Sequence, residues 1–286
     1  MKSYIFIFLT LINITIMNSQ PNKTSEKYNK GWNKLKEIDG EAGEKVVNGL
    51  KDISPELSRF IIEYSFGEVY SLTTLDNKSK EIVAISSLIA QGAIPELKVH
   101  LNGALNTGST INEVKEIILQ MSVYCGFPKC INGMKALRQV LEERKALGII
   151  DKEGKTASTN TTIDKYTLGA KFLAILKDNQ EQILKENFQN LSPELVRLTI
   201  EYGYGDIFSR DNLDKKYRQI STISALATLG NAQPQLKFHI EAGLNIGLTV
   251  DEIKEIMLMM TVYAGFPASI NGTNSLKEVI QEHKNQ

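Results

Sequence analysis

The feature that most constrains the fold of this chain is an internal repeat. Residues 113–144 read EVKEIILQMSVYCGFPKCINGMKALRQVLEER and residues 252–283 read EIKEIMLMMTVYAGFPASINGTNSLKEVIQEH, with seventeen of the 32 aligned positions identical. The match continues upstream, where SPELSRFIIEY at 54–64 corresponds to SPELVRLTIEY at 192–202. A repeat this long and this complete indicates a duplicated domain and not a short solenoid unit.

The repeat divides the 286 residues into two copies joined by a linker. Residues 21–147 form the first copy and 163–286 the second, while 148–162 are rich in Lys, Gly, Ser, Thr and Asn, which is typical of a linker. Residues 1–20 have a basic start, an apolar run and a polar exit, the pattern of a secretory signal peptide cleaved near Ser19. The run is too short and too interrupted for a typical membrane span, although an uncleaved anchor is the alternative. We therefore expect a periplasmic or secreted protein that is not attached to a membrane after signal removal.

Both copies carry start and stop signals of helices. Thr110 and Thr249 each begin a T-x-x-E capping box. Pro128 and Pro267 follow Gly-Phe, where one helix is broken and the next can start. We find no convincing run of alternating strands. The sequence predicts an all-α fold class, with two tandem helical domains of about six or seven helices each.

Charge and short motifs narrow the class of partner. Lys plus Arg and Asp plus Glu number 33 each, so the formal net charge is zero. A neutral chain has no electrostatic reason to bind nucleic acid or an anionic membrane. No phosphate-binding loop, dinucleotide fingerprint or HExxH motif is present. We expect a small-molecule partner, no nucleic acid, no cofactor and no metal.

One long segment, present in both copies, connects the chain to a known family. PELKVHLNGALNTGSTINEVKEIILQMSVYCGFP from Pro95, and PQLKFHIEAGLNIGLTVDEIKEIMLMMTVYAGFP from Pro234, resemble the central signature of the carboxymuconolactone decarboxylase family. YGYGDIFSRDNL at 202–213 is similar to the family's aromatic-glycine segment. The resemblance implies an all-helical fold, cofactor-free decarboxylation of a carboxylated muconolactone, and rings of six single-domain subunits. A trimer of this tandem chain would rebuild such a six-domain ring.

Two histidines at matching places of the repeat are the first candidates for catalysis. His100 and His239 both lie on an expected helix, and imidazole suits acid–base chemistry near neutral pH. Glu96 precedes His100 by four residues and so shares its helix face. In the sister branch of alkylhydroperoxidase D-like proteins, the place of Glu81 is that of the proton-relay glutamate. We therefore predict these four as catalytic residues, while the alternative is that the histidines are structural and hydrogen-bonded.

The polar residues differ between the copies. The second copy has glutamine at the places of both glutamates, and it has Arg210 and Arg218 where the first copy has leucine and lysine. Arginine recognises a carboxylate with two hydrogen bonds, so these two are the predicted clamp for a carboxylated substrate. Tyr124 and Tyr263 recur before the Gly-x-Pro break and are predicted to line the substrate pocket, with packing as the alternative. Solvated surface charges without function would explain the asymmetry equally well.

The positions of the cysteines indicate whether this chain shares the chemistry of the alkylhydroperoxidase D-like branch. The resemblance implies that this branch reduces peroxides through a Cys pair at the places that Ala93 and Glu96 occupy here. Because the thiolate is the reacting group, this replacement argues against thiol peroxidase chemistry. Cys125 and Cys130 fit neither CxxC nor a zinc pattern, and the sequence leaves open whether they pair.

Taken together, the sequence predicts an exported enzyme, a carboxy-lyase that acts on a small carboxylated lactone or oxo-acid by His acid–base catalysis. A non-catalytic helical binding or assembly module is the alternative, followed by a thiol antioxidant protein. The substrate, the number of active copies and the oligomer size stay open.

Overall fold

The protein is all-α throughout the part described by this computed structural model, residues 25–158 and 163–284. The first copy contains α1 (Glu26–Ile38), α2 (Gly40–Asn48), α3 (Pro55–Phe60), the π-helix η1 (Ile61–Val69), α4 (Asn77–Gln91), α5 (Ile94–Asn106), α6 (Ile111–Tyr124) and α7 (Phe127–Ala146). The second contains α8 (Lys165–Leu176), α9 (Gln180–Phe188), α10 (Pro193–Leu198), the π-helix η2 (Thr199–Phe208), α11 (Lys215–Leu229), α12 (Gln233–Asn245), α13 (Val250–Tyr263) and α14 (Phe266–Lys284). The predicted fold class, two tandem helical copies in which each element recurs in order, is confirmed.

The N-terminal end of the chain was predicted to be a signal peptide. That segment, residues 1–20, lies outside the described residues. Among the helices that the structure describes, none combines the length and the apolar character needed to span a bilayer.

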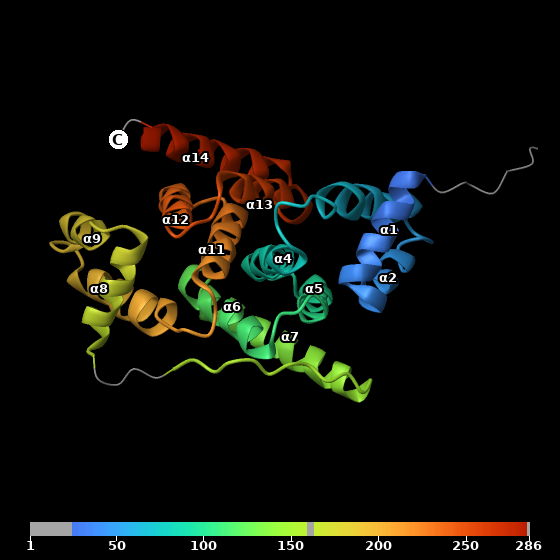
Figure 1. Ribbon diagram of the computed structural model, residues 1–286, viewed down its shortest axis with the longest axis horizontal. Helices are drawn as coiled ribbons and strands as arrows, with labels where there is room; N and C mark the ends of the chain where they lie inside the picture. Colours follow the sequence, from blue (N-terminus) through green and yellow to red (C-terminus); the bar gives the residue numbers. More distant parts are fainter. Residues whose placement is uncertain (1–24, 159–162, 285–286) are drawn as a thin grey trace, which may run out of the picture.

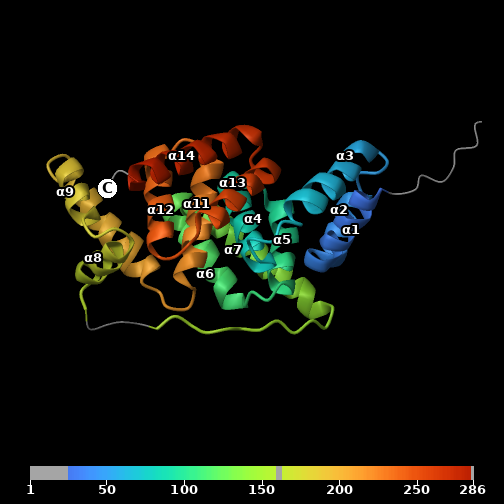
Figure 2. The ribbon, with the colours of Figure 1, turned by 45° about the horizontal axis from the view of Figure 1, so that its top comes forward.

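The two copies share one core. Figures 1 and 2 show α4 and α11 side by side at the centre, with α1 and α2 at one end of the molecule and α8 and α9 at the other. Twelve of the 15 residues of α4 and ten of the 15 residues of α11 are buried, including the serines. Ser86 Oγ donates a hydrogen bond to Ser221 Oγ at 2.8 Å across the central contact. Burial of both central helices therefore depends on the presence of both copies.

A glycine in each copy allows the first helix to touch the π-helix. A Cβ on Gly31 of α1 would lie 2.0 Å from the carbonyl oxygen of Ile62 in η1. Gly169 of α8 would meet the oxygen of Ile200 in η2 at 2.1 Å. Only glycine permits such close packing of two backbones. This contact holds α1 and α8 at their places at the two ends of the molecule.

The same arrangement brings the end of α1 to α5. Asn106, near the end of α5, donates a hydrogen bond through Nδ2 to the carbonyl oxygen of Ile38 at 3.0 Å. In the second copy Asn245 does the same for Leu176 at 2.7 Å. These asparagines satisfy the free carbonyl groups that end a helix. In the first copy, the residue that follows is Asp39, which is thereby held beside α5.

Candidate functional site

A buried cluster in the first copy surrounds His100. Its Nδ1 lies 3.0 Å from Oε2 of Glu81 on α4 and 3.8 Å from Oδ1 of Asp39 at the end of α1. All three side chains are buried. Gly103, one turn after the histidine, leaves room for the carboxylates: a Cβ there would lie 2.4 Å from Glu81 Oε2 and 2.7 Å from Asp39 Oδ1. Helices α1, α4 and α5 thus bring two acidic groups to one imidazole.

The other ring nitrogen of His100 faces the second copy. Its Nε2 lies 3.3 Å from the hydroxyl of Tyr263 on α13, and the two rings meet edge to face with centroids 5.2 Å apart. The Tyr263 hydroxyl is also hydrogen-bonded to the hydroxyl of Tyr70, which lies 3.0 Å from Oε1 of Glu81. Tyr263 comes from the second copy and the rest from the first, so the site is formed only where the two copies meet.

The carboxylates change the proton affinity of the histidine. Burial alone would lower the pKa of His100, but the nearby charges of Glu81 and Asp39 and the hydrogen bond from Glu81 outweigh it and raise the pKa to about 9. Burial, together with the charge of Glu81, raises the pKa of Asp39 to about 7. Burial also raises the pKa of Tyr70 and Tyr263 well above the usual value for tyrosine. At neutral pH, His100 is therefore an imidazolium and both tyrosines are neutral hydrogen-bond donors.

A small cavity of about 90 Å³ adjoins His100. Apolar side chains make up most of its wall, and Asp39 and Glu96 contribute the acidic groups. Glu96 is exposed on α5, one turn before His100, as the spacing of four residues predicted. The cavity gives a small ligand access to the imidazole and to two carboxyl groups.

The matching histidine of the second copy lies in neutral surroundings. His239 is buried, and its Nδ1 lies 3.0 Å from Oε1 of Gln219, which occupies the place of Glu81. The ring of Tyr124, from the first copy, meets it edge to face at 5.2 Å, as Tyr263 meets His100. Asp39 is replaced by Lys177, which pairs with Glu241 at 2.8 Å. Burial without a compensating charge lowers the pKa of His239 to about 3, so this ring is neutral at any physiological pH.

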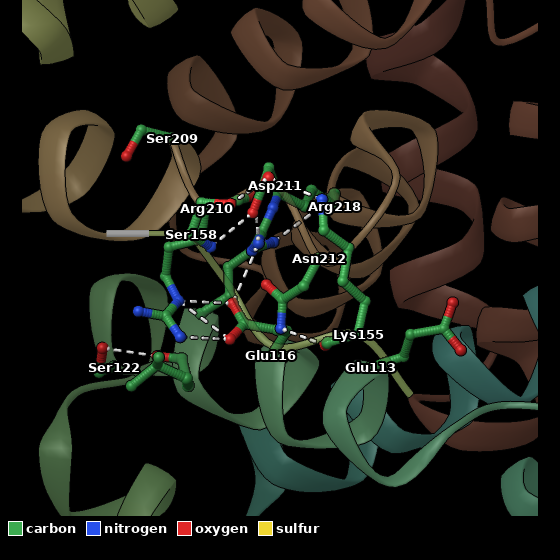
Figure 3. Close-up of polar contacts among 12 residues, drawn as sticks. Glu113, Glu116, Ser122, Lys155, Ser158, Ser209, Arg210, Asp211, Asn212 and Arg218 are labelled. Atoms are coloured by element: carbon green, nitrogen blue, oxygen red, sulfur yellow. Dashed lines mark hydrogen bonds and ion pairs between the residues drawn. The ribbon is translucent and has the colours of Figure 1, made fainter. Parts of the chain in front are cut away.

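The two arginines that were predicted to hold a substrate carboxylate are instead bound to Glu116 (Figure 3). Arg210 donates to both oxygens of Glu116 at 2.7–2.9 Å. Arg218 is fully buried and donates to Glu116 at 3.0 Å and to Gln120 at 3.2 Å. This geometry does not support a substrate clamp, because the carboxylate that they bind belongs to the first copy. The sequence could not show this, since Glu116 lies about a hundred residues away along the chain.

An equivalent ion pair joins the copies at the matching places of the repeat. Lys80, at the place of Arg218, lies 3.3 Å from Glu255, at the place of Glu116. Lys80 also donates to the carbonyl oxygen of Tyr70 at 2.9 Å, which helps to fix that tyrosine in the site. Both ion pairs are buried, so they serve contact between the copies and do not bind a ligand.

The two cysteines are free thiols in the structure. Burial raises the pKa of Cys125 to about 11 and also raises the pKa of Cys130, so neither is a thiolate at neutral pH. A reactive cysteine requires the opposite shift. The thiol antioxidant alternative therefore has no support from this part of the molecule.

The His100 cluster contains the donor groups of a candidate metal site. One donor atom each from Asp39, Glu81 and His100 lies within 4.8 Å of the others. However, His100 Nδ1 is already hydrogen-bonded to Glu81, and proton binding by His100 and Asp39 offsets the charge of the buried carboxylates. Without an ion, the three residues form a hydrogen-bonded acid–base cluster.

Sequence reasoning missed Asp39 and Tyr70 in this cluster. Both lie far from the signature segment along the chain, and in the second copy they are replaced by Lys177 and Phe208. The difference between the copies was the one available signal. A comparison of the two copies that searched for titratable residues lost in the second would have identified both.

The fold and the site define a class: all-helical tandem proteins in which a helix-borne imidazole is enclosed between two copies of a domain. Comparison with known proteins assigns the family. The model of the carboxymuconolactone decarboxylase family matches residues 55–139 and 193–278, and the chain belongs to this family.

Individual relatives agree with this assignment. The 4-carboxymuconolactone decarboxylase of Acinetobacter baylyi is 33% identical over 122 residues, which cover 41% of this chain and 89% of that protein. The nitrosuccinic acid decarboxylase of Metarhizium robertsii is 33% identical over 103 residues, covering 35% and 72%. A crystal structure of a proposed gamma-carboxymuconolactone decarboxylase subunit from Burkholderia xenovorans has a TM-score of 0.56 at 21% identity, over 90% of this chain and 98% of that one. At this identity the structural likeness shows a shared fold.

Proposed function

We propose that this protein is a cofactor-free decarboxylase with one active site per chain, at His100. The observation that carries the proposal is the buried Asp39–Glu81–His100 cluster, which keeps the imidazole protonated next to a cavity. Support for the reaction class comes from the decarboxylases among its relatives. A protonated, enclosed imidazole is the group that such a reaction needs as its acid.

The proposed reaction is a decarboxylation followed by protonation of the substrate carbon. The bond between the substrate carbon and its carboxylate breaks, CO₂ leaves, and the electron pair passes to an adjacent carbonyl group as an enolate. The protonated ring of His100, which lines the cavity, would stabilise that negative charge by a hydrogen bond, and the Tyr263 hydroxyl 3.3 Å from Nε2 would help to orient the ring. The imidazolium then gives its proton to the carbon, and water restores it. Glu81 holds the ring by its Nδ1–H throughout.

The volume of the cavity limits the substrate. About 90 Å³ is well below the 300–1,000 Å³ that encloses a drug-sized ligand. We therefore propose a compact carboxylated lactone or oxo-acid as the substrate. Exposed Glu96 at the cavity wall would disfavour a second carboxylate on that side of the ligand.

For the second copy we propose a non-catalytic role, which the neutral surroundings of His239 support. It supplies Tyr263 to the His100 site, and its ion pairs hold the copies together. The binding or assembly function that the sequence left as an alternative would thus apply to one half of the chain.

A pair of matched variants tests the proposal. CO₂ release from 4-carboxymuconolactone, nitrosuccinate and small oxo-acids is measured for the full chain, for His100→Gln and for His239→Gln. Loss of a general acid costs about 10²–10⁴-fold in rate. We expect that loss for His100→Gln, and wild-type turnover for His239→Gln. Equal loss in both variants, or full activity of His100→Gln, would contradict a single site at His100.

Two further properties are proposed with it. Large apolar side chains are exposed on the surfaces of both copies at matching places of the repeat: Leu57, Phe60, Phe266 and Ile270, which correspond to Leu195, Leu198, Phe127 and Ile131. We propose that these surfaces bind further copies of the chain, as in a trimer with six domains; light scattering that gives a monomer would contradict this.

We also propose export with removal of residues 1–20, which an intact N-terminus on the mature protein would contradict.

A further inference from the structure

A second cavity, away from His100, lies between α6, α7 and the linker. Its volume is about 710 Å³. Its apolar wall comes from Leu119 on α6 and from Met134, Leu137 and Leu141 on α7. Thr156 and Ala157 of the linker close it on one side. This groove has the size of a site for a drug-sized organic ligand, whereas the cavity at His100 has room only for a smaller one.

The linker wall is held in place by hydrogen bonds at both ends. The backbone N–H groups of Ile111 and Asn112, at the start of α6, donate to the carbonyl oxygens of Lys152 and Glu153 at 2.9 Å. Lys155 pairs with Asp211 of the second copy at 2.7 Å. The backbone and hydroxyl of Ser158 donate to the same carboxylate.

This wall has no counterpart in the family signature. The family match ends at residue 139 and resumes at 193, so the segment that closes the groove lies outside both matched regions. The groove is therefore a feature of this tandem chain and does not follow from membership of the family.

Unused polar groups line this groove. Arg210 binds Glu116 through Nε and one terminal nitrogen, and its other terminal nitrogen points away from that carboxylate (Figure 3). Asn212 is nine-tenths buried, and its Oδ1 has no hydrogen-bond partner. Arg138 and Lys145 on α7 form no ion pair with any residue that the structure describes.

The charges of the groove favour an anion. Of its two acidic residues, Glu116 is neutralised by Arg210 and Arg218, which leaves Glu142. Lys115 is engaged with Glu153 at 3.1 Å. The groups that remain are Arg138 and Lys145 of α7, the acidic Glu142 and part of the Arg210 guanidinium, so free cationic groups outnumber the free acid around the apolar wall.

We propose that this groove is a second ligand site, which binds an amphipathic organic anion. The anionic head, a carboxylate or sulfonate, lies between Arg138, Lys145 and the free nitrogen of Arg210, where charge-assisted hydrogen bonds form. An aromatic or aliphatic body packs on the leucines and Met134. The buried Oδ1 of Asn212 accepts a hydrogen bond from a hydroxyl or N–H of the ligand. The site is separate from His100, so the proposal stands independently of the decarboxylase reaction.

The test uses the full chain and the fluorescent sulfonate 1-anilinonaphthalene-8-sulfonate, displaced by decanoate. We expect saturable binding of one probe per chain. The double variant Arg138→Gln/Lys145→Gln, changed only at exposed side chains, should raise the Kd roughly three- to tenfold, since two partly exposed ionic contacts are lost. Ala157→Trp, which fills the groove from the linker, should weaken binding at least as much.

Two controls decide the outcome. Lys277→Gln changes the exposed residue of the second copy that corresponds to Arg138, and it should leave the Kd unchanged, as should His100→Gln. A probe that binds the double variant and the wild type equally well would overturn the proposal. So would wild-type protein that binds no probe, as expected if another copy of the chain covers the groove.

Discussion

Replacing Glu81 by glutamine should convert the charged site of the first copy toward the neutral site of the second. The two sites differ mainly in acidic groups: the pKa of His100 is about 9 and that of His239, beside Gln219, is about 3. Removing Glu81 takes away its charge and its charged hydrogen bond while burial remains, so the pKa of His100 falls. The carboxyl group of Asp39 keeps it above that of His239.

The size of the effect follows from the shift. The interval from the ordinary value of 6.5 to about 9 corresponds to about 3 kcal/mol at 1.36 kcal/mol per pH unit, which is what remains after burial opposes the charges of Glu81, Asp39 and Glu96. Because the folded state binds the His100 proton more tightly, this stabilisation is complete below pH 6.5 and is lost as pH rises through about 9. The raised pKa of Asp39 acts in the same direction, so stability falls as pH rises from about 4 to 7.

Proton titration of the imidazole by NMR and urea unfolding at several pH values measure both quantities. In Glu81→Gln we expect a lower His100 pKa and a flatter decline of unfolding free energy between pH 6.5 and 9. Gln219→Glu is the reverse change and should raise the pKa of His239. If Glu81→Gln leaves the titration of His100 unchanged, the electrostatic account of the site is wrong.

Two further predictions concern packing and metal. Gly31→Ala should destabilise the fold by about 1–3 kcal/mol, because the new Cβ would meet the Ile62 carbonyl at 2.0 Å; Gly203→Ala, whose Cβ has no neighbour nearer than 3.8 Å, is the control in urea unfolding. Dialysis against a chelator should leave turnover unchanged, because protons balance the charge at His100; a loss of activity that added zinc restores would show instead that the Asp39–Glu81–His100 cluster is a metal site.

Much of the fold could be predicted from the sequence because it rests on local signals. The capping boxes at Thr110 and Thr249 are present with both reciprocal hydrogen bonds. The repeat predicted the recurrence of every element. The two π-helices were not predicted, since the long i to i+5 spacing of their hydrogen bonds leaves no pattern distinct from that of an α-helix.

The site was harder to predict because it depends on contacts between distant segments. Glu81 and His100 were both predicted as catalytic residues, Glu81 from the resemblance alone, and they lie on the consecutive helices α4 and α5. Tyr263 reaches His100 across 163 residues of chain, and sequence reasoning had no means to assign it to the opposite copy. For Arg210 the residue type suggested a clamp for a substrate carboxylate. In the structure its partner is Glu116, a buried glutamate of the first copy.

Whether the second copy retains a polar residue of the site depends on which of the two histidines that residue contacts. The positions of Asp39, Tyr70 and Glu81 serve the histidine of their own copy, and the second copy has lost the acidic or phenolic group at all three. Tyr263, by contrast, serves the histidine of the other copy, and it is kept. A charged pair of sites would hold four buried carboxyl groups near a shared core, each of them costly to desolvate. Fusion of two domains in one chain removes the need for symmetry, so one site can keep its charges while the other supplies packing and a single hydroxyl group.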